Sequence, residues 1–234
     1  MRILIATHKS WNVARAEKLK KDEPNHDIRV ISAKEELTEE MVKDFNPDYI
    51  FFPHWSYFIP EEIYENWNCV VFHMTDLPFG RGGSPLQNLI VRGIKTTKLS
   101  AIRVVKEMDA GPVYLKENLE LTGAAHEIYD RASEIIYDRM IPRILKGDIV
   151  PKEQEGEVVT FKRRTPEDGE LKPDMSAETI YDYIRMLDAE GYPNAFMKFG
   201  EYTLEFSEAS LDGDAVEAKV RIRKSSGVMS SEEK

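Results

Sequence analysis

The sequence predicts an α/β fold: a Rossmann-like, doubly wound and mostly parallel sheet, followed by a small mixed α+β C-terminal unit. The first observation is the short apolar run Arg2–Ala6, which precedes a polar loop and a helical stretch over 13–21. The second is that further apolar runs alternate with helical segments, as in doubly wound domains. These runs are Asp27–Ile31, Asp48–Phe52 and Cys69–Phe72. Continuous apolar runs are typical of parallel strands buried on both faces.

Capping residues, prolines and glycines mark the ends of the remaining elements in the first domain. Helices are expected over 38–45, 61–67, 84–93 and 124–145. Two further β-rich runs, at 99–106 and 111–115, extend the sheet. We therefore expect a first domain over residues 1–160.

Beyond Pro151 the composition becomes more polar, and a small α+β unit is expected over 161–224. Ser176 is placed to cap a helix that ends near Gly191. Three strands should follow, over 195–199, 202–207 and 215–223, and the tail at 225–234 should be disordered.

The net charge of −10 makes nucleic acid a poor default partner, because an acidic chain repels phosphate backbones. The single cysteine, Cys69, rules out an internal disulfide and is expected to be a buried hydrophobe rather than a nucleophile. The sequence shows neither a signal peptide nor an apolar stretch near the ~20 residues of a membrane span. We expect a cytoplasmic protein that does not bind membranes.

His73 stands where the run Cys69–Phe72 ends, and the loop after it contains three glycines and two prolines. Ligands in open α/β sheets bind beyond the carboxyl ends of the strands. An imidazole changes charge near neutral pH, so His73 is a candidate for proton transfer. Val71 should face the same side of the sheet as His73.

Three more segments could reach this edge, and for each a structural interpretation stays open. The loop at 7–12 either contacts a substrate or is solvated, with Ser10 or Asn12 capping the next helix. The apolar segment 54–60 either packs in the core or lines a pocket for a flat ring. Asp109 is either a turn residue or a partner of the site.

The blocks His73-Met-Thr-Asp-Leu-Pro78, Gly82-Gly-Ser-Pro85 and Met108-Asp-Ala-Gly-Pro-Val113 resemble the formyltransferase family that uses N10-formyltetrahydrofolate. The separation of 109 − 73 = 36 residues between histidine and aspartate matches that family's pattern. The resemblance covers roughly residues 1–165. Segments 161–169 and 191–196 most resemble the sugar N-formyltransferases, and the block at 73–90 is also similar to formylation domains of peptide synthetases.

The resemblance implies formyl transfer from N10-formyltetrahydrofolate to the primary amine of a nucleotide-linked amino sugar. A UDP- or dTDP-linked 4-amino-4,6-dideoxy sugar is the expected acceptor, in cell-surface polysaccharide or nonulosonic-acid biosynthesis. The implied catalytic residues are His73, Asp109 and Thr75. The implied folate-binding residues are Trp55, Tyr57, Phe58, Ile59 and Asp109. The implied substrate-binding residues are Ser10, Trp11, Asn12, Arg81, Gly82 and Gly83, and no metal is expected.

The sequence departs from the family's Asn-x-His pattern, because Val71 stands where the asparagine holds the oxyanion. Losing one such donor typically costs ~2.7–4 kcal/mol. Thr75, a neighbouring backbone N–H or a protonated His73 could replace it. Arg81 would either meet an acceptor phosphate or be an ordinary surface arginine.

Two alternatives remain: a non-catalytic folate- or nucleotide-binding module, and formylation of another amine, either aminoacyl-tRNA or a carrier-bound aminoacyl group. The negative charge and the short C-terminal unit disfavour tRNA. The apolar strands of that unit could form a homodimer interface.

Overall fold

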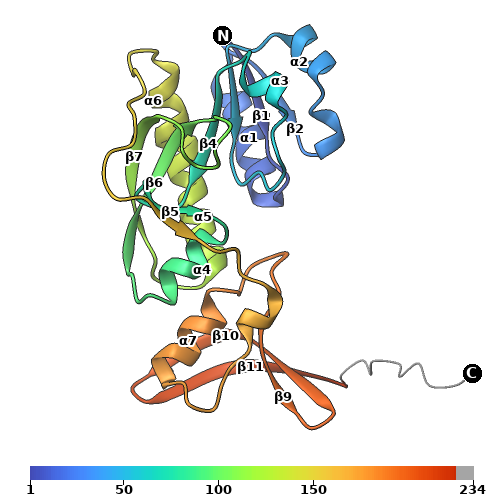
Figure 1. The fold of residues 1–234 in the computed structure, drawn as a ribbon. Helices are drawn as coiled ribbons and strands as arrows, with labels where there is room; N and C mark the ends of the chain where they lie inside the picture. Colours follow the sequence, from blue (N-terminus) through green and yellow to red (C-terminus); the bar gives the residue numbers. More distant parts are fainter. Residues whose placement is uncertain (225–234) are drawn as a thin grey trace, which may run out of the picture. The chain divides into compact units, whose positions relative to one another are not determined.

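The computed structural model describes residues 1–224, which form two compact units (Figure 1). The first unit comprises Met1–Pro85, Lys95–Leu121 and Ile128–Arg163. The second begins at Arg164 but also takes in Leu86–Ile94 and Thr122–Glu127. The expected boundary near residue 160 therefore lies close to where the chain leaves the first unit, but a single cut does not separate the two. The tail expected to be disordered lies outside the described residues.

The first unit contains a six-stranded sheet in the order β2-β1-β3-β4-β6-β7. Its parallel strands are β1 (Arg2–Ala6), β2 (Asp27–Ile31), β3 (Tyr49–Phe52) and β4 (Cys69–His73). The antiparallel strands are β6 (Thr96–Arg103) and β7 (Val113–Glu120). The mostly parallel, doubly wound sheet predicted from the apolar runs is confirmed.

Alternate side chains of the buried strands enter different apolar layers, as the pleat of a sheet requires. One layer joins strand residues to α2 (Glu39–Phe45) and α3 (Glu61–Tyr64). Its buried members include Leu4, Ile50, Phe52 and Cys69 from the sheet, and Val42, Phe45 and Ile63 from the helices. Thr38 caps α2, with its hydroxyl accepting the Met41 N–H. Cys69 is fully buried in this layer, and burial raises the pKa of its thiol to about 12.

Helix α1 (Ser10–Asp22) lies beside α5 (Ala125–Ile135), where Arg15 and Asp130 form an ion pair at 2.7 Å. The prediction of a single regular helix over 124–145 is wrong. Helix α5 is followed by a π-helical turn, Ile136–Met140, and then by α6 (Ile141–Leu145). Pro142 has no N–H for the regular helical bond, which is a local reason for the wider turn.

The glycine-rich loop after β4 contains a strand that the sequence did not predict. β5 (Phe79–Gly82) pairs in parallel with β8 (Val159–Phe161), separately from the large sheet. The Phe79 and Phe161 rings meet edge to face, with centroids 5.3 Å apart. This small sheet contacts His73 through the Gly80 carbonyl of β5.

The second unit is an antiparallel sheet in the order β11-β10-β9, with one longer helix. The strands are β9 (Ala195–Phe199), β10 (Tyr202–Asp212) and β11 (Ala215–Lys224). Ser176 caps α7 (Ala177–Arg185) as expected, but the helix ends six residues before Gly191 (191 − 185 = 6). Three short elements complete the described chain. They are α4 (Pro85–Ile90), a 3₁₀ turn at Lys34–Glu36 in the first unit, and a 3₁₀ turn at Pro166–Gly169 in the second. Within residues 1–224, no helix has the length and apolar character to cross a membrane.

Candidate active site

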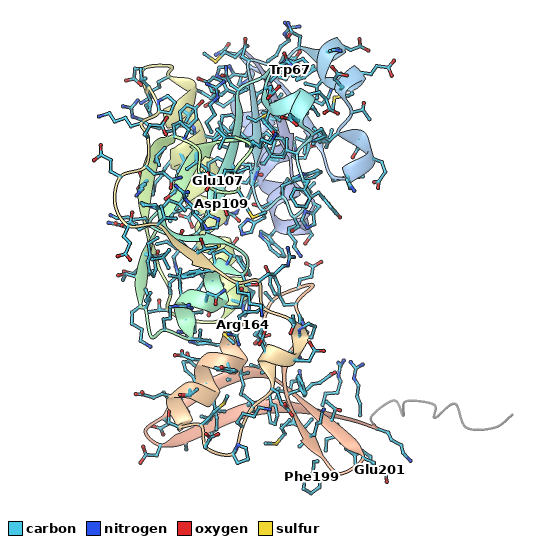
Figure 2. The ribbon with its side chains drawn as sticks, viewed as in Figure 1. Trp67, Glu107, Asp109, Arg164, Phe199 and Glu201 are labelled. Atoms are coloured by element: carbon cyan, nitrogen blue, oxygen red, sulfur yellow. The ribbon has the colours of Figure 1, made fainter. Side chains whose placement is uncertain are left out.

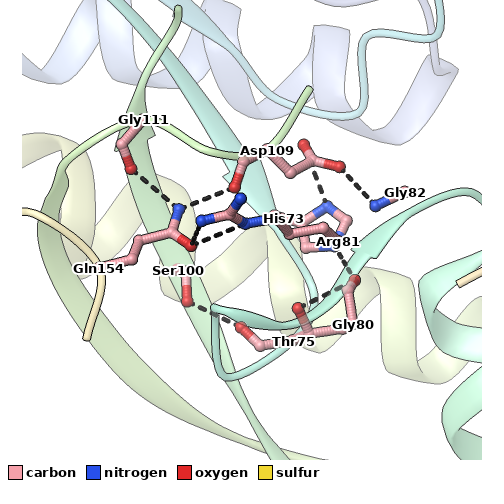
Figure 3. A network of polar contacts seen from close by, with 9 residues as sticks. All are labelled: His73, Thr75, Gly80, Arg81, Gly82, Ser100, Asp109, Gly111 and Gln154. Carbon is pink, nitrogen blue, oxygen red and sulfur yellow. Dashed lines mark hydrogen bonds and ion pairs between the residues drawn. The ribbon is translucent and has the colours of Figure 1, made fainter. Parts of the chain in front are cut away.

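His73 and Asp109 face each other at the edge of the large sheet (Figure 3). His73 is the last residue of β4, and Asp109 lies in the turn between β6 and β7. The His73 Nδ1 atom is 3.5 Å from Asp109 Oδ1, and both side chains are largely buried. β6 pairs antiparallel with β4, with Ser100 opposite His73 and Arg103 opposite Val70. The turn after β6 therefore begins beside the start of β4 and folds back to bring Asp109 to His73.

Asp109 is both a turn residue and a neighbour of His73, so its two interpretations are compatible. Its backbone has a φ of +54°, in the left-handed region that aspartate tolerates better than most residues. Its Oδ2 atom accepts the Gly82 N–H at 2.9 Å, while Oδ1 faces His73. The carboxylate therefore links β5 to the imidazole.

The other nitrogen of His73 is held by the loop that follows it. Its Nε2 atom lies 2.7 Å from the Gly80 carbonyl oxygen. A carbonyl can only accept, so Nε2 carries the hydrogen and donates it. This bond sets the ring orientation and leaves Nδ1 facing the carboxylate.

Thr75 contacts the same carbonyl rather than the His73–Asp109 gap. Its hydroxyl donates to the Gly80 oxygen at 3.4 Å, and its own carbonyl accepts from Ser100 Oγ at 2.7 Å. The residue is fully buried. These contacts give Thr75 a bracing role, and its expected role as an oxyanion donor stays a prediction.

Arg81 is held by neighbouring side chains of the first unit. Its Nε and Nη2 atoms donate to Gln154 Oε1 at 3.1 and 2.9 Å, and its Nη1 pairs with Glu107 Oε1 at 3.3 Å. Glu107 and Asp109 lie on the same turn (Figure 2). Sequence reasoning missed Gln154, which lies in a polar stretch with no motif around it.

Gly82 and Gly83 have steric reasons to be glycine. Gly82 has a φ of +101°, and a Cβ there would lie 2.5 Å from the Phe161 carbonyl oxygen. A Cβ on Gly83 would lie 2.5 Å from the Cβ of Arg163. These contacts allow β5 to approach β8, and substrate contact by either residue stays a prediction.

Val71 pairs with Phe52 on β3 and with Ile102 on β6. Its side chain packs against the apolar layer that contains Leu4 and Phe52. The position of the family's asparagine therefore lies against the core of this chain, and its side chain offers no hydrogen-bond donor.

Ser10, Trp11 and Asn12 lie in the first turn of α1 and not in a loop. The N-cap is Lys9, without a side-chain capping bond, so the capping hypothesis for Ser10 or Asn12 is wrong. Asn12 is fully buried, and its Nδ2 atom lies 3.0 Å from His54 Nδ1. The buried amide thus ties α1 to the segment after β3.

The segment after β3 divides between core and surface. Trp55 and Ile59 pack against the apolar layer, whereas Tyr57 and Phe58 are 42% and 87% exposed. His54 has a φ of +50°. Burial, with smaller contributions from the charges of Lys9 and His8, lowers the pKa of His54 to about 4. His54 is therefore neutral at pH 7.

Rings from three segments gather at this edge, and we call them the aromatic edge cluster. Its members are His8, Trp11, His54, Trp55, Tyr57 and Tyr129. The Trp11 and Tyr129 rings are stacked at 6.4 Å, and the His54 and Tyr129 rings meet edge to face at 5.2 Å. The segments that follow β1 and β3 supply all of these rings except Tyr129, which lies on α5.

Several buried polar atoms of this cluster and of Asn12 have no hydrogen-bond partner within the described protein. They are His8 Nδ1, Trp11 Nε1, Asn12 Oδ1, His54 Nε2 and Trp55 Nε1. A buried unpaired polar group typically costs about 1–3 kcal/mol, so these five atoms need partners from outside the described protein, either water or a ligand. Within residues 1–224, no group of three or more His, Cys, Asp or Glu side chains could hold a metal ion.

Comparison with known proteins identifies both parts of the chain. Residues 3–142 match the family model "Formyl transferase", and residues 166–223 match "Methionyl-tRNA formyltransferase, C-terminal domain". Methionyl-tRNA formyltransferase of Rickettsia bellii is 27% identical over 180 residues, covering 74% of this chain and 59% of the relative. That of Sulfurihydrogenibium sp. is 27% identical, covering 74% and 57%. The chain thus spans less than two thirds of the length of these curated relatives.

Solved structures show the same fold. Methionyl-tRNA formyltransferase from Clostridium thermocellum is 57% identical, with a TM-score of 0.94, covering 96% of this chain and 99% of that chain. HypX from Aquifex aeolicus in complex with tetrahydrofolic acid is 20% identical, with a TM-score of 0.74, covering 89% and 38%. A sugar N-formyltransferase from Shewanella sp. is 15% identical, with a TM-score of 0.70, covering 91% and 98%. The last two likenesses concern the fold alone.

These relatives correct the expected acceptor. The expectations of an amino-sugar substrate linked to a nucleotide, and of no nucleic-acid partner, are wrong, because the relatives with higher identity are named methionyl-tRNA formyltransferases. The C-terminal unit was expected to be too short for this class, yet it matches that class's C-terminal model. The expected formyltransferase class is confirmed. The chain belongs to the formyl transferase family.

Proposed function

We propose that this chain transfers the formyl group of N10-formyltetrahydrofolate to the α-amino group of an aminoacyl-tRNA, with methionyl-tRNA as the acceptor. The observation that carries the proposal is the His73–Asp109 pair at the sheet edge, in a chain 57% identical to a solved protein with that name. The match of residues 166–223 to the C-terminal model of the same class supports it.

In the proposed reaction, the amine nitrogen forms a bond to the formyl carbon and the bond from that carbon to folate N10 breaks. The amine must lose a proton, and N10 must gain one. His73 Nδ1 is available for this transfer because Nε2 is occupied by the Gly80 carbonyl. Asp109 Oδ1, at 3.5 Å, balances the charge of the imidazolium. The imidazolium or a backbone N–H then stabilises the oxyanion in place of the missing asparagine.

The aromatic edge cluster fits a ligand with a flat ring and polar edges. The exposed rings of Tyr57 and Phe58 offer faces for stacking. The unpartnered Trp55 Nε1 and His54 Nε2 atoms offer polar partners nearby. We assign the folate to Trp55, Tyr57, Phe58 and Ile59, and the acceptor to the side of Trp11 and Asn12. A cytoplasmic location stays a prediction.

The acidic net charge does not prevent local contact with tRNA. The last six residues of β11 carry four basic side chains: Lys219, Arg221, Arg223 and Lys224. Lys219, Arg221 and Arg223 share one face of the strand, because side chains alternate. Lys219 and Arg223 form ion pairs with Glu208 and Glu205. We propose this strand, and Arg221 above all, as a phosphate contact.

The test uses the full chain with N10-formyltetrahydrofolate and charged methionyl-tRNA. Formyl-methionyl-tRNA should form together with one equivalent of tetrahydrofolate. With uncharged tRNA as the acceptor, no tetrahydrofolate should be released. The proposal fails if a folded protein that binds tetrahydrofolate transfers no formyl group to methionyl-tRNA.

A further inference from the structure

The side-chain amide of Gln154 joins its own loop to the turn of Asp109 and Gly111 and to Arg81 on β5 (Figure 3). Its Nε2 atom donates to the Asp109 carbonyl at 2.7 Å and to the Gly111 carbonyl at 2.9 Å. Its Oε1 atom accepts from Arg81 Nε and Nη2. We propose that Gln154 is a positioning residue that holds Asp109 in the geometry needed for formyl transfer, a role that rests on the proposed function.

The turn that carries Asp109 needs such support. Asp109 is in the left-handed region, which L side chains rarely adopt. Gly111 is pressed against the end of β6, since a Cβ there would lie 1.8 Å from the Arg103 carbonyl oxygen. Gln154 bonds the carbonyls on both sides of Ala110, so it holds the part of the turn that aims the carboxylate.

The loop that carries Gln154 is anchored beside this turn. Lys152 and Val113 exchange two backbone hydrogen bonds, at 2.7 and 2.9 Å. This bridge lies two residues from Gln154 on one side and two residues from Gly111 on the other. The position of Gln154 relative to the Asp109 turn is thus set by backbone as well as by side-chain contacts.

The partners of Gln154 explain why an amide suits this position. Arg81 can only donate, so Oε1 must face the guanidinium and Nε2 must face the two carbonyls. Glutamate has the same length and would keep the contact with Arg81. It would also place a carboxylate oxygen against two carbonyl oxygens, replacing two attractive contacts by repulsion. Gln154→Glu therefore separates the Asp109 contact from the Arg81 contact.

The consequence should appear at His73. The Asp109 carboxylate bonds Gly82 through one oxygen and faces His73 Nδ1 with the other. A shift of the turn would move Oδ1 away from the imidazole. Displacements of about 1 Å from a catalytic position can cost on the order of 10²-fold in rate. A residue that only stabilised the fold would leave the ionisation of His73 unchanged.

The experiment compares Gln154→Glu with Asp109→Asn, and with the neighbouring Glu155→Gln as the control, since Glu155 is exposed. Gln154→Glu should lower kcat about 10- to 100-fold, with KM values for both substrates within about twofold of wild type. Its pH–rate profile should shift toward that of Asp109→Asn, and the double variant should lose little more than Asp109→Asn alone. Glu155→Gln should behave as wild type.

A second readout needs no turnover. An NMR titration of the His73 imidazole, assigned from the spectrum of His73→Gln, should shift in Gln154→Glu toward the curve of Asp109→Asn. If Gln154→Glu does not fold, Gln154→Met offers similar length without hydrogen bonds. The inference is overturned if a folded variant keeps wild-type kcat and His73 titration, or if its loss adds fully to that of Asp109→Asn. Failure of wild-type protein to formylate methionyl-tRNA would instead overturn the proposed function, and the titration would still test Gln154.

Discussion

The Asp109 Oδ1 atom lies 3.5 Å from His73 Nδ1, although 36 residues separate the two in sequence (109 − 73 = 36). Neither residue lies in the other's strand or loop: His73 ends β4, and Asp109 occupies the turn after β6. β6 runs antiparallel to β4 and ends beside Val70, so the contact exists because the turn after β6 folds back toward the end of β4. Four experiments test what this arrangement and its surroundings predict.

Replacing either member of the pair should remove proton transfer while leaving the fold intact. His73→Gln and Asp109→Asn should each lower kcat by about 10²- to 10⁴-fold, because a positioned acid or base contributes that much. Single-turnover formylation of methionyl-tRNA measures the effect, and urea unfolding serves as the control for folding. Turnover within about threefold of wild type in either variant would show that the pair is not catalytic.

Gly82→Ala should destabilise the chain through a clash as well as through backbone strain. Its Cβ would lie 2.5 Å from the Phe161 carbonyl oxygen, and its φ is +101°. Gly147→Ala is the matched control, because its φ is +75° and no atom lies within 4 Å of its Cβ position. We expect a loss of about 1 kcal/mol in the free energy of unfolding for Gly147→Ala, and at least about twice that for Gly82→Ala. Urea unfolding gives both values, and equal losses would contradict the steric explanation.

His54 should make the protein less stable in mild acid. Its pKa is lowered from 6.5 to about 4 by burial. Between these values the unfolded chain binds a proton that the folded chain does not, so stability falls as the pH drops from 6.5 toward 4. The contribution is up to about 3 kcal/mol and is absent above pH 6.5.

His54→Asn provides the comparison for this pH effect, because asparagine tolerates the φ of +50° and does not titrate. Unfolding free energies measured at several pH values should fall less steeply for the variant than for wild type between pH 6.5 and 4. Parallel curves would show that His54 is not held in its neutral form.

Arg221 should contribute to tRNA affinity through phosphate contact alone. Arg221→Ala should weaken binding and reduce the slope of log K against log salt by about one, because one phosphate contact is lost. Filter binding over a salt series measures the slope. Lys18→Ala, a change of an exposed lysine on α1, is the control that should leave the slope unchanged. An unchanged slope in Arg221→Ala would remove β11 from the proposed tRNA surface.

Strands and caps were predictable where local signals were strong. The ranges of β1, β2 and β9 agree with the apolar runs, and Ser176 caps α7 as predicted. The acceptor was predicted wrongly because the prediction of a sugar substrate rested on segments 161–169 and 191–196, the net charge and the short C-terminal unit, whereas residues 166–223 match the methionyl-tRNA formyltransferase C-terminal model. The early start of α1 and the strand β5 were also missed. β5 depends on pairing with β8, which begins 80 residues after β5 begins (159 − 79 = 80).

The sequence by itself determined the doubly wound sheet, because apolar runs are a local property of the chain. The motifs around His73 and Asp109 indicated the family through their resemblance to its members. Only the tertiary structure decided how these residues are held. The Gly80 carbonyl accepts from His73 Nε2, the Gly82 N–H donates to Asp109, and Gln154 donates to the turn between β6 and β7. Gln154 and Asp109 are 45 residues apart, and no periodicity relates them. Their contact depends on how β5, β6 and the loop before β8 pack together, and that packing is specified by the whole fold.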